Sequence, residues 1–228
     1  MVNKTKNAFT LAEVLITLVI IGIVAALTIP TAINKFRERA TIEKIKSSYA
    51  ILSSAYRLAQ MENGKKYSEW NCDGFYNYSN MSKQSNCMTH YIKKHLNRVK
   101  DCKFGIDSNV MAKCFNVDDT RVYYIVGDYF VDFSAGGGAD MFILSNGVPV
   151  YIRAGEHFIF IKTDNAKKLV LNKNLFFFYF FDDEGLAPYN MYIAPMDKEK
   201  IRRGRQEGAW ALSAVRWIIQ NNNMDYLH

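Results

Sequence analysis

The first part of the chain is a long apolar run with a short polar segment before it. Residues Val14 to Asn34 include no charged side chain. A helix rises about 1.5 Å per residue, so this run would span about 32 Å, close to the hydrocarbon thickness of a bilayer. The run can therefore cross a membrane. Residues 1–8 carry Lys4 and Lys6, as the basic region of an export signal does.

Beyond the apolar run the helical pattern continues in amphipathic form. Charged side chains lie mostly on other faces than the recurring apolar ones, which are Ile33, Phe36, Ala40, Ile45, Tyr49, Leu52, Tyr56 and Ala59. We therefore predict one helix from about Phe9 to Glu62, with Asn63-Gly64 as its C-cap. Gly22 and Pro30 are where we expect this helix to bend or locally unwind.

The remaining residues, 64–228, have the size of one domain. Residues 64–120 are polar and hold all four cysteines, which predicts a loop-rich region with a short helix near 88–96. Residues 121–185 predict strands at 122–126, 129–133, 141–144, 148–153, 157–162 and 175–181, with a hairpin turn at Asn146-Gly147. Residues 205–220 predict a final helix that packs through Trp210, Ala214, Trp217 and Ile218.

The pattern as a whole predicts an α+β fold, in which the long helix packs on an antiparallel sheet. The aromatic segment 175–181 predicts a strand that is buried on both faces. Its second face is a candidate for contact with another subunit.

One charged residue, Glu13, stands at the start of the apolar run. A charge at bilayer depth costs about 2.5 to 3.5 kcal/mol on insertion scales, so it usually has a partner of opposite charge. A plain membrane anchor does not account for this residue. In a subunit inserted alone we expect Glu13 to be poorly satisfied.

An ordinary signal peptide is one alternative for this region. Val24-Ala25-Ala26 places small residues at the offsets that a signal peptidase needs for a cut after Ala26. Ordinary export signals do not carry a glutamate at the start of their apolar segment, so we favour a different interpretation.

Residues 8–16, Ala-Phe-Thr-Leu-Ala-Glu-Val-Leu-Ile, followed by Gly22 and Pro30, resemble the N-terminus of type IV pilins and of the pseudopilins of type II secretion systems. In that family a prepilin peptidase removes a short basic leader on the cytoplasmic side and methylates the new N-terminal residue. The resemblance places the cut between Ala8 and Phe9, with methylation of Phe9. Ala8 stands where the family prefers glycine.

The resemblance also implies partners and a location. The partners would be the prepilin peptidase, an inner-membrane assembly platform, and further pilin-like subunits of the same or another kind. The chain would cross the inner membrane once with its head outside the cytoplasm, and would then enter a pilus or a periplasmic filament. It would be a structural subunit, not an enzyme.

Electrostatics leads to the same assembly residues. After cleavage the amine of Phe9 is cationic, and Glu13 of a neighbouring subunit can neutralise it inside a helix bundle of low dielectric constant. This pairing favours one stagger of the added subunit. Because the contact joins two different surfaces, it propagates as an open helical polymer.

The basic residues beside the apolar run indicate the opposite orientation. Two precede the run, whereas the following segment has Lys35, Arg37, Arg39, Lys44 and Lys46. The positive-inside rule would therefore place the C-terminal part in the cytoplasm. We follow the leader motif because it is the more specific signal.

The four cysteines contain no Cys-x-x-Cys pair, which disfavours zinc. In an exported domain an even number of cysteines favours disulfides. Of the three possible connectivities we favour the local one, which joins Cys72 to Cys87 and Cys102 to Cys114. The alternative is four reduced thiols in a domain that meets no oxidant.

The sequence lacks the common motifs of catalysis. It has no Gly-x-Ser-x-Gly, no phosphate-binding loop and no His-Glu-x-x-His, and Gly136 to Gly138 are typical of a turn. Asp182 and Asp183 begin an acidic turn in the half of the head where some pseudopilins hold calcium. The regular spacing of acidic ligands is missing, so a solvated turn is the favoured interpretation. We expect no catalytic residue and no cofactor.

The formal net charge of +7 raises the question of nucleic-acid binding. The head has one tight basic cluster, made of Lys198, Lys200, Arg202, Arg203 and Arg205. We expect a solvated helix start there and not a nucleic-acid site.

The sequence therefore predicts a leader (1–8), a membrane and assembly half of the long helix (9–34), an amphipathic half (35–63) and a head (64–228). The favoured function is a structural subunit that polymerises through its N-terminal helix. The alternative is a membrane-tethered extracytoplasmic binding domain that does not polymerise.

Overall fold

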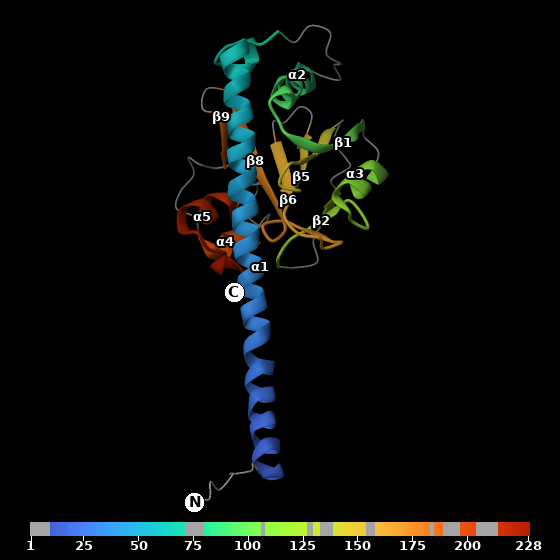
Figure 1. The fold of residues 1–228 in the computed structure, drawn as a ribbon. Coiled ribbons are helices and arrows are strands. Elements are labelled where there is room, and N and C mark those ends of the chain that lie inside the picture. The colour runs from blue at the N-terminus through green and yellow to red at the C-terminus, as the bar shows by residue number, and fades with distance from the viewer. Residues whose placement is uncertain are drawn as a thin grey trace, which may run out of the picture. The chain divides into compact units, whose positions relative to one another are not determined.

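The structure is a computed structural model, and it describes residues 10–71, 80–105, 108–126, 130–132, 139–153, 158–182, 185–188, 197–203 and 214–228. The chain forms two compact units that meet in sequence between Ala40 and Thr41. The first unit contains the N-terminal part of one long helix. The second contains the rest of that helix and the head (Figure 1).

The described elements are mixed helices and strands. The helices are α1 (Leu11–Asn63), α2 (Asn80–Lys94), α3 (Ser108–Phe115), α4 (Lys198–Arg203) and α5 (Ala214–Asn221), with short 3-10 helices η1 (Tyr67–Glu69) and η3 (Asp225–Leu227). The strands are β1 (Arg98–Gly105), β2 (Arg121–Tyr123), β3 (Phe130–Asp132), β4 (Ala139–Leu144), β5 (Pro149–Arg153), β6 (Phe158–Lys162), β7 (Leu169–Val170), β8 (Leu175–Phe181) and β9 (Gly185–Pro188). This composition confirms the predicted α+β class.

Helix α1 confirms the single long helix that the periodicity predicts. It ends at Asn63, and Gly64 follows as the C-cap. The φ of Gly64, +106°, suits a residue without a Cβ, and its N–H donates to the Gln60 carbonyl at 2.9 Å. The α-helical assignment continues through Gly22 and Pro30. Neither residue unwinds α1 here, and a bend at these positions stays a prediction.

The main sheet of the head has six strands in the order β1-β4-β5-β6-β8-β9, and every neighbouring pair is antiparallel. Strands β4 and β5 form the predicted hairpin, whose turn contains Gly147 with a φ of +78°. The antiparallel sheet of the predicted fold is therefore present.

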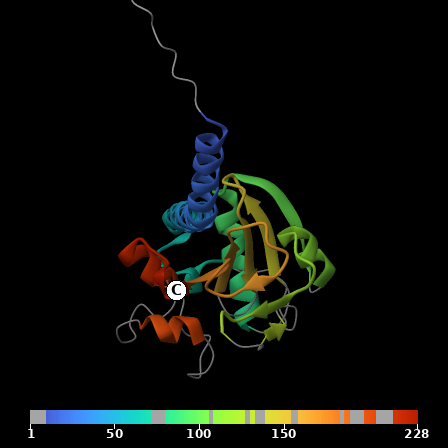
Figure 2. The same ribbon diagram turned by 90° about the horizontal axis from the view of Figure 1, so that it is seen from below.

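The second half of α1 covers one face of this sheet (Figures 1 and 2). Ile45 and Tyr56 are buried there together with Phe178 and Phe180. The rings of Tyr56 and Phe180 stack with their centroids 4.9 Å apart. Full burial of such side chains contributes about 1.5 to 3 kcal/mol each, so this part of α1 belongs to the core of the head.

Strand β8 is buried on both faces along most of its length, as predicted. Leu175 and Phe177 lie in a second core with Phe115, Val122 and Phe160. That core is formed with α3 and the small sheet β3-β2-β7, in which β2 and β7 are parallel. The expectation that the second face of this strand meets another subunit is wrong for Leu175 and Phe177, because the head itself covers them.

The prediction of a loop-rich region at residues 64–120 is wrong for the described part, whereas the short helix predicted near 88–96 is present as the end of α2. This region contains α2, β1 and α3. Residues 80–86 of α2 are almost entirely polar in sequence, whereas Cys87, Met88, Thr89 and Ile92 are buried. The recognisable helical period is therefore confined to the C-terminal part of α2, which is the part that the sequence predicts.

The predicted C-terminal helix is present as α5 in its described part, and residues 205–213 lie outside the described residues. Helix α5 begins at Ala214 and buries Ala214, Val215 and Ile218, while Trp217 is partly buried. Trp210 lies outside the described residues.

Asn172 links the C-terminal elements to the turn between β7 and β8. Its side-chain Oδ1 accepts a hydrogen bond from the Ala214 N–H at 3.0 Å, and its Nδ2 donates to the Ile201 carbonyl at 3.3 Å. Its backbone carbonyl accepts a 2.8 Å hydrogen bond from the Tyr226 hydroxyl. Asn172 has a φ of +61° and is buried. One residue therefore holds α4, α5 and η3 in place.

Candidate functional site

The start of α1 carries a reciprocal pair of hydrogen bonds between Thr10 and Glu13. The Glu13 carboxylate accepts hydrogen bonds from the backbone N–H and the hydroxyl of Thr10, both at 2.8 Å. The Glu13 N–H donates to the Thr10 hydroxyl oxygen at 3.3 Å. This arrangement is a capping box, which satisfies two backbone donors that the first turn of a helix leaves without partners.

The capping box corrects one sequence-based expectation. Glu13 in a single subunit is not poorly satisfied, because its carboxylate has two donors from Thr10 and lies in the first turn of α1, where the helix dipole favours a negative charge. The signal was readable in the sequence as Thr-x-x-Glu before an apolar run. Any partner that takes Glu13 must compete with Thr10.

The apolar segment that follows Glu13 has no partner within the described chain. Helix α1 has a window long and apolar enough to cross a membrane, and none of that window is buried. The large exposed side chains include Leu18, Ile21 and Leu27. A contiguous apolar surface of this extent is typical of a segment that contacts lipid or other helices.

The predicted processing site lies at the edge of the described chain. Ala8 and Phe9 are outside the described residues, and α1 begins at Leu11 with Thr10 as its N-cap. The described structure therefore places Glu13, but neither side of the predicted cut.

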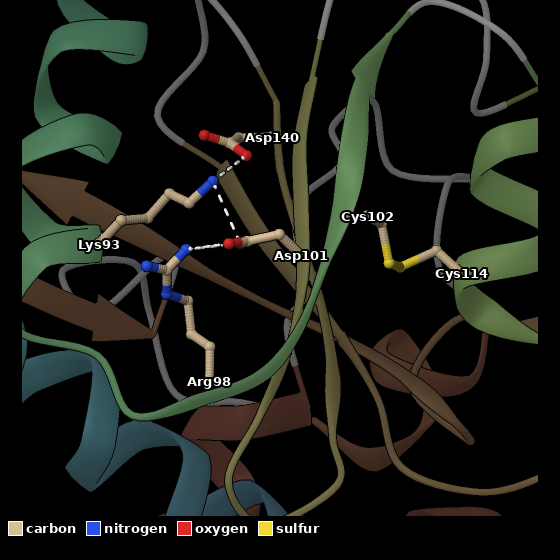
Figure 3. The surroundings of a disulfide bond; sticks show 6 residues. All are labelled: Lys93, Arg98, Asp101, Cys102, Cys114 and Asp140. Carbon is tan, nitrogen blue, oxygen red and sulfur yellow. Dashed lines mark hydrogen bonds and ion pairs between the residues drawn. A yellow bond between two sulfur atoms is a disulfide. The ribbon is translucent and has the colours of Figure 1, made fainter.

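A disulfide joins Cys102 on β1 to Cys114 on α3 (Figure 3). Their Cα atoms are 5.9 Å apart. Cys87 is also disulfide-bonded, and Cys72, its expected partner, lies outside the described residues. The bond between Cys102 and Cys114 is one of the two that the local connectivity requires.

Charged side chains bridge α2 and the main sheet beside this disulfide. The ammonium of Lys93 lies 2.7 Å from a carboxylate oxygen of Asp140 and 3.4 Å from one of Asp101, which also pairs with Arg98 (Figure 3). Strand β1 is an edge of the sheet. Charges along an edge strand oppose pairing with other strands, so we interpret this cluster as structural.

Asp182 supports η1 in the structure. Its carboxylate accepts hydrogen bonds from the Ser68 N–H at 3.0 Å and from the Ser68 hydroxyl at 2.6 Å. Asp183 lies outside the described residues. Among the described residues no group of three or more possible metal ligands comes together.

The predicted basic cluster is engaged in local pairs. Lys198 lies 2.8 Å from Asp225, and Arg202 lies 3.6 Å from Glu199. The hydrogen bond from Lys198 is the main reason why the pKa of Asp225 is held below its ordinary value. The structure does not describe Arg205. The described pairs fit the expected solvated helix start.

Comparison with known proteins gave one finding. Residues 3–29 match the family described as the prokaryotic N-terminal methylation motif, which is the signature of type IV pilins and pseudopilins. The match covers most of the predicted leader, the Thr10–Glu13 capping box and most of the apolar run. Neither the curated proteins nor the solved structures gave a match.

Proposed function

We propose that this chain, which carries the N-terminal signature of type IV pilins and pseudopilins, is a structural subunit that a prepilin peptidase processes and that polymerises through α1. The observation that carries the proposal is the placement of Glu13. It is the one acidic residue at the head of an exposed apolar helix, inside the matched motif. The capping box alone does not require that charge, because glutamine also serves at this position of a capping box.

Polymerisation uses an exchange of partners at Glu13. The processed Phe9 amine of one subunit replaces the Thr10 donors at Glu13 of the next. A full positive charge is a stronger partner than two neutral donors inside a dry helix bundle. The exchange joins two different surfaces of the subunit, so addition continues into an open helical polymer.

The proposed location follows from the same motif. The chain is anchored in the inner membrane by the apolar part of α1, with the head outside the cytoplasm, until an assembly platform adds it to a filament. The disulfide between Cys102 and Cys114 supports an extracytoplasmic head, because disulfides persist in oxidising compartments.

The first prediction concerns processing. Protein purified from its own membrane should begin at Phe9 and carry a methyl group on its N-terminal amine, because the resemblance of residues 8–16 to pilin N-termini implies a cut between Ala8 and Phe9. Intact-mass and N-terminal peptide mass spectrometry measure both features. The control is the same protein from cells without the peptidase, which should begin at Met1.

Two outcomes of that measurement contradict the proposal. A chain that begins at Leu27 shows ordinary signal-peptidase cleavage. A chain that still begins at Met1 in cells with the active peptidase shows that Ala8 does not support the cut.

A second prediction concerns the redox state of the head. If the head is exported, a thiol label applied to denatured, unreduced protein should modify none of the four cysteines. Peptide mapping of the same sample should recover Cys102 linked to Cys114 and Cys72 linked to Cys87.

The control for that labelling is protein that is denatured, reduced and freed of reductant before labelling, which should take four labels. Four labelled thiols in the unreduced sample would contradict an extracytoplasmic head. They would agree with the orientation that the basic residues after the apolar run indicate.

A further inference from the structure

The basic residues just after the apolar run have no role in the proposed filament contact. Lys35, Arg37 and Arg39 are exposed, and Phe36 between them is 75% exposed. In the part of the chain that the structure describes, no hydrogen bond or ion pair engages these three basic side chains. We call Lys35, Phe36, Arg37 and Arg39 the collar.

The next basic residues along α1 behave differently. Lys44 donates a 2.6 Å hydrogen bond to the Thr163 carbonyl, and Lys46 donates one of 2.6 Å to the Asn222 side chain. These two contacts fix Lys44 and Lys46 to the head. Both residues belong to the second compact unit, whereas the collar belongs to the first.

The collar surrounds the helix. At about 100° per residue, Lys35 and Arg39 lie on one side of α1, Arg37 lies on the opposite side and Phe36 lies between them. A single partner protein would need only one side of a helix. A layer of lipid headgroups meets a membrane-spanning helix from every side.

The position along α1 also fits a headgroup layer. The uncharged run before Lys35 spans about 32 Å, the thickness of the hydrocarbon core, and Lys35 to Arg39 add about 6 Å. The polar region on each side of a bilayer is about 5 to 7 Å thick. Long Lys and Arg side chains at this depth place their apolar stems along the hydrocarbon boundary and their charged ends among the headgroups.

We propose that the collar binds the headgroups of anionic phospholipids at the membrane surface next to Asn34. This inference rests on the proposed membrane insertion of α1. Glu38 also lies within the collar segment, and three cations against one carboxylate leave the segment with a net positive charge. Each Lys or Arg near an anionic surface adds roughly fivefold to membrane affinity. The collar therefore keeps lipids of one charge beside the subunit.

The test uses full-length protein in micelles with equal amounts of phosphatidylglycerol and phosphatidylcholine, and native mass spectrometry to count the lipids that stay bound. We expect phosphatidylglycerol to be retained about threefold or more over phosphatidylcholine, with a preference that falls as salt is added. The triple variant Lys35→Gln, Arg37→Gln, Arg39→Gln should lose this preference.

The matched control removes the same charge from the head through Lys65→Gln, Lys100→Gln and Lys173→Gln, three exposed residues. It should keep the preference. Equal retention of both lipids by the unchanged protein, or equal loss in both triple variants, would overturn the inference.

Failure of the collar and failure of the proposed function give different results. Lipid preference in micelles depends neither on processing at Phe9 nor on filament growth. If the protein selects phosphatidylglycerol but never assembles, the inference about the collar holds and the proposed function fails. If the protein is processed and assembles without lipid preference, the proposed function holds and the inference about the collar fails.

Discussion

Glu13→Gln should abolish filament assembly while leaving membrane insertion and processing intact. Glutamine is also a capping-box residue, so the hydrogen bonds to Thr10 and the start of α1 can persist. The change removes only the negative charge. An incoming Phe9 amine then enters a dry bundle without a counter-charge, and an uncompensated buried ion costs several kcal/mol.

The experiment expresses Glu13→Gln as the sole copy of the subunit. Mass spectrometry of membranes confirms processed protein, and shearing of the cells or an assay of the associated secretion reports assembly. Thr10→Ala is the matched control, because it weakens the cap but keeps the carboxylate, so it should still assemble. Normal assembly of Glu13→Gln would favour the membrane-tethered binding domain.

Asn172→Ala should be the most damaging single substitution among the described polar residues of the head. Alanine loses two side-chain hydrogen bonds and leaves the Ala214 N–H and the Ile201 carbonyl without their partner. Each unsatisfied buried group costs about 1 to 3 kcal/mol. Alanine is also less tolerant of a φ of +61° than asparagine, whose short polar side chain can hydrogen-bond locally, so part of a left-handed strain of about 1 to 2 kcal/mol is no longer offset.

Thermal unfolding of the purified protein in detergent, followed by near-ultraviolet circular dichroism, should show Tm lower by about 10 °C, since each kcal/mol moves the Tm of a domain of this size by about 2 to 4 °C. Asn116→Ala is the matched control, because Asn116 also has a positive φ, +53°, but is exposed. It should lower the Tm by only a few degrees. Equal shifts in the two variants would show that the side-chain bonds of Asn172 contribute nothing.

The parts that the sequence predicts well are those where one period persists over many residues. The apolar and amphipathic halves of α1 keep a helical pattern up to Gly64, and β8 is an unbroken aromatic segment. The Asn146-Gly147 turn also has a strong local signal, because few residues tolerate a positive φ there.

The parts that the sequence does not predict depend on contacts made by the fold. Strand β9, Gly185–Pro188, has a composition that disfavours strands, yet it pairs with β8 at the edge of the sheet, where proline is tolerated. The pairing of β2 with β7 joins segments far apart in the chain. Neither contact leaves a period in the sequence.

The candidate site also combines features that the sequence indicates with features that only the structure adds. The charge of Glu13 and its place in the motif are readable from the sequence, and its hydrogen bonds to Thr10 correspond to a more local signal, the Thr-x-x-Glu spacing of a capping box. In the sequence the collar residues bear only on orientation. Their exposure and lack of described partners gave them another interpretation.

Under the proposed exchange, the capping box also affects the critical concentration, which is the concentration of subunit in the membrane above which filaments grow. Each addition gains one ion pair and gives up the hydrogen bonds between Thr10 and Glu13, so the critical concentration depends on the difference between these two free energies. About 1.4 kcal/mol in that difference changes the critical concentration tenfold. A strong cap keeps a reservoir of dispersed subunits, and a weaker cap would allow growth from a sparser membrane.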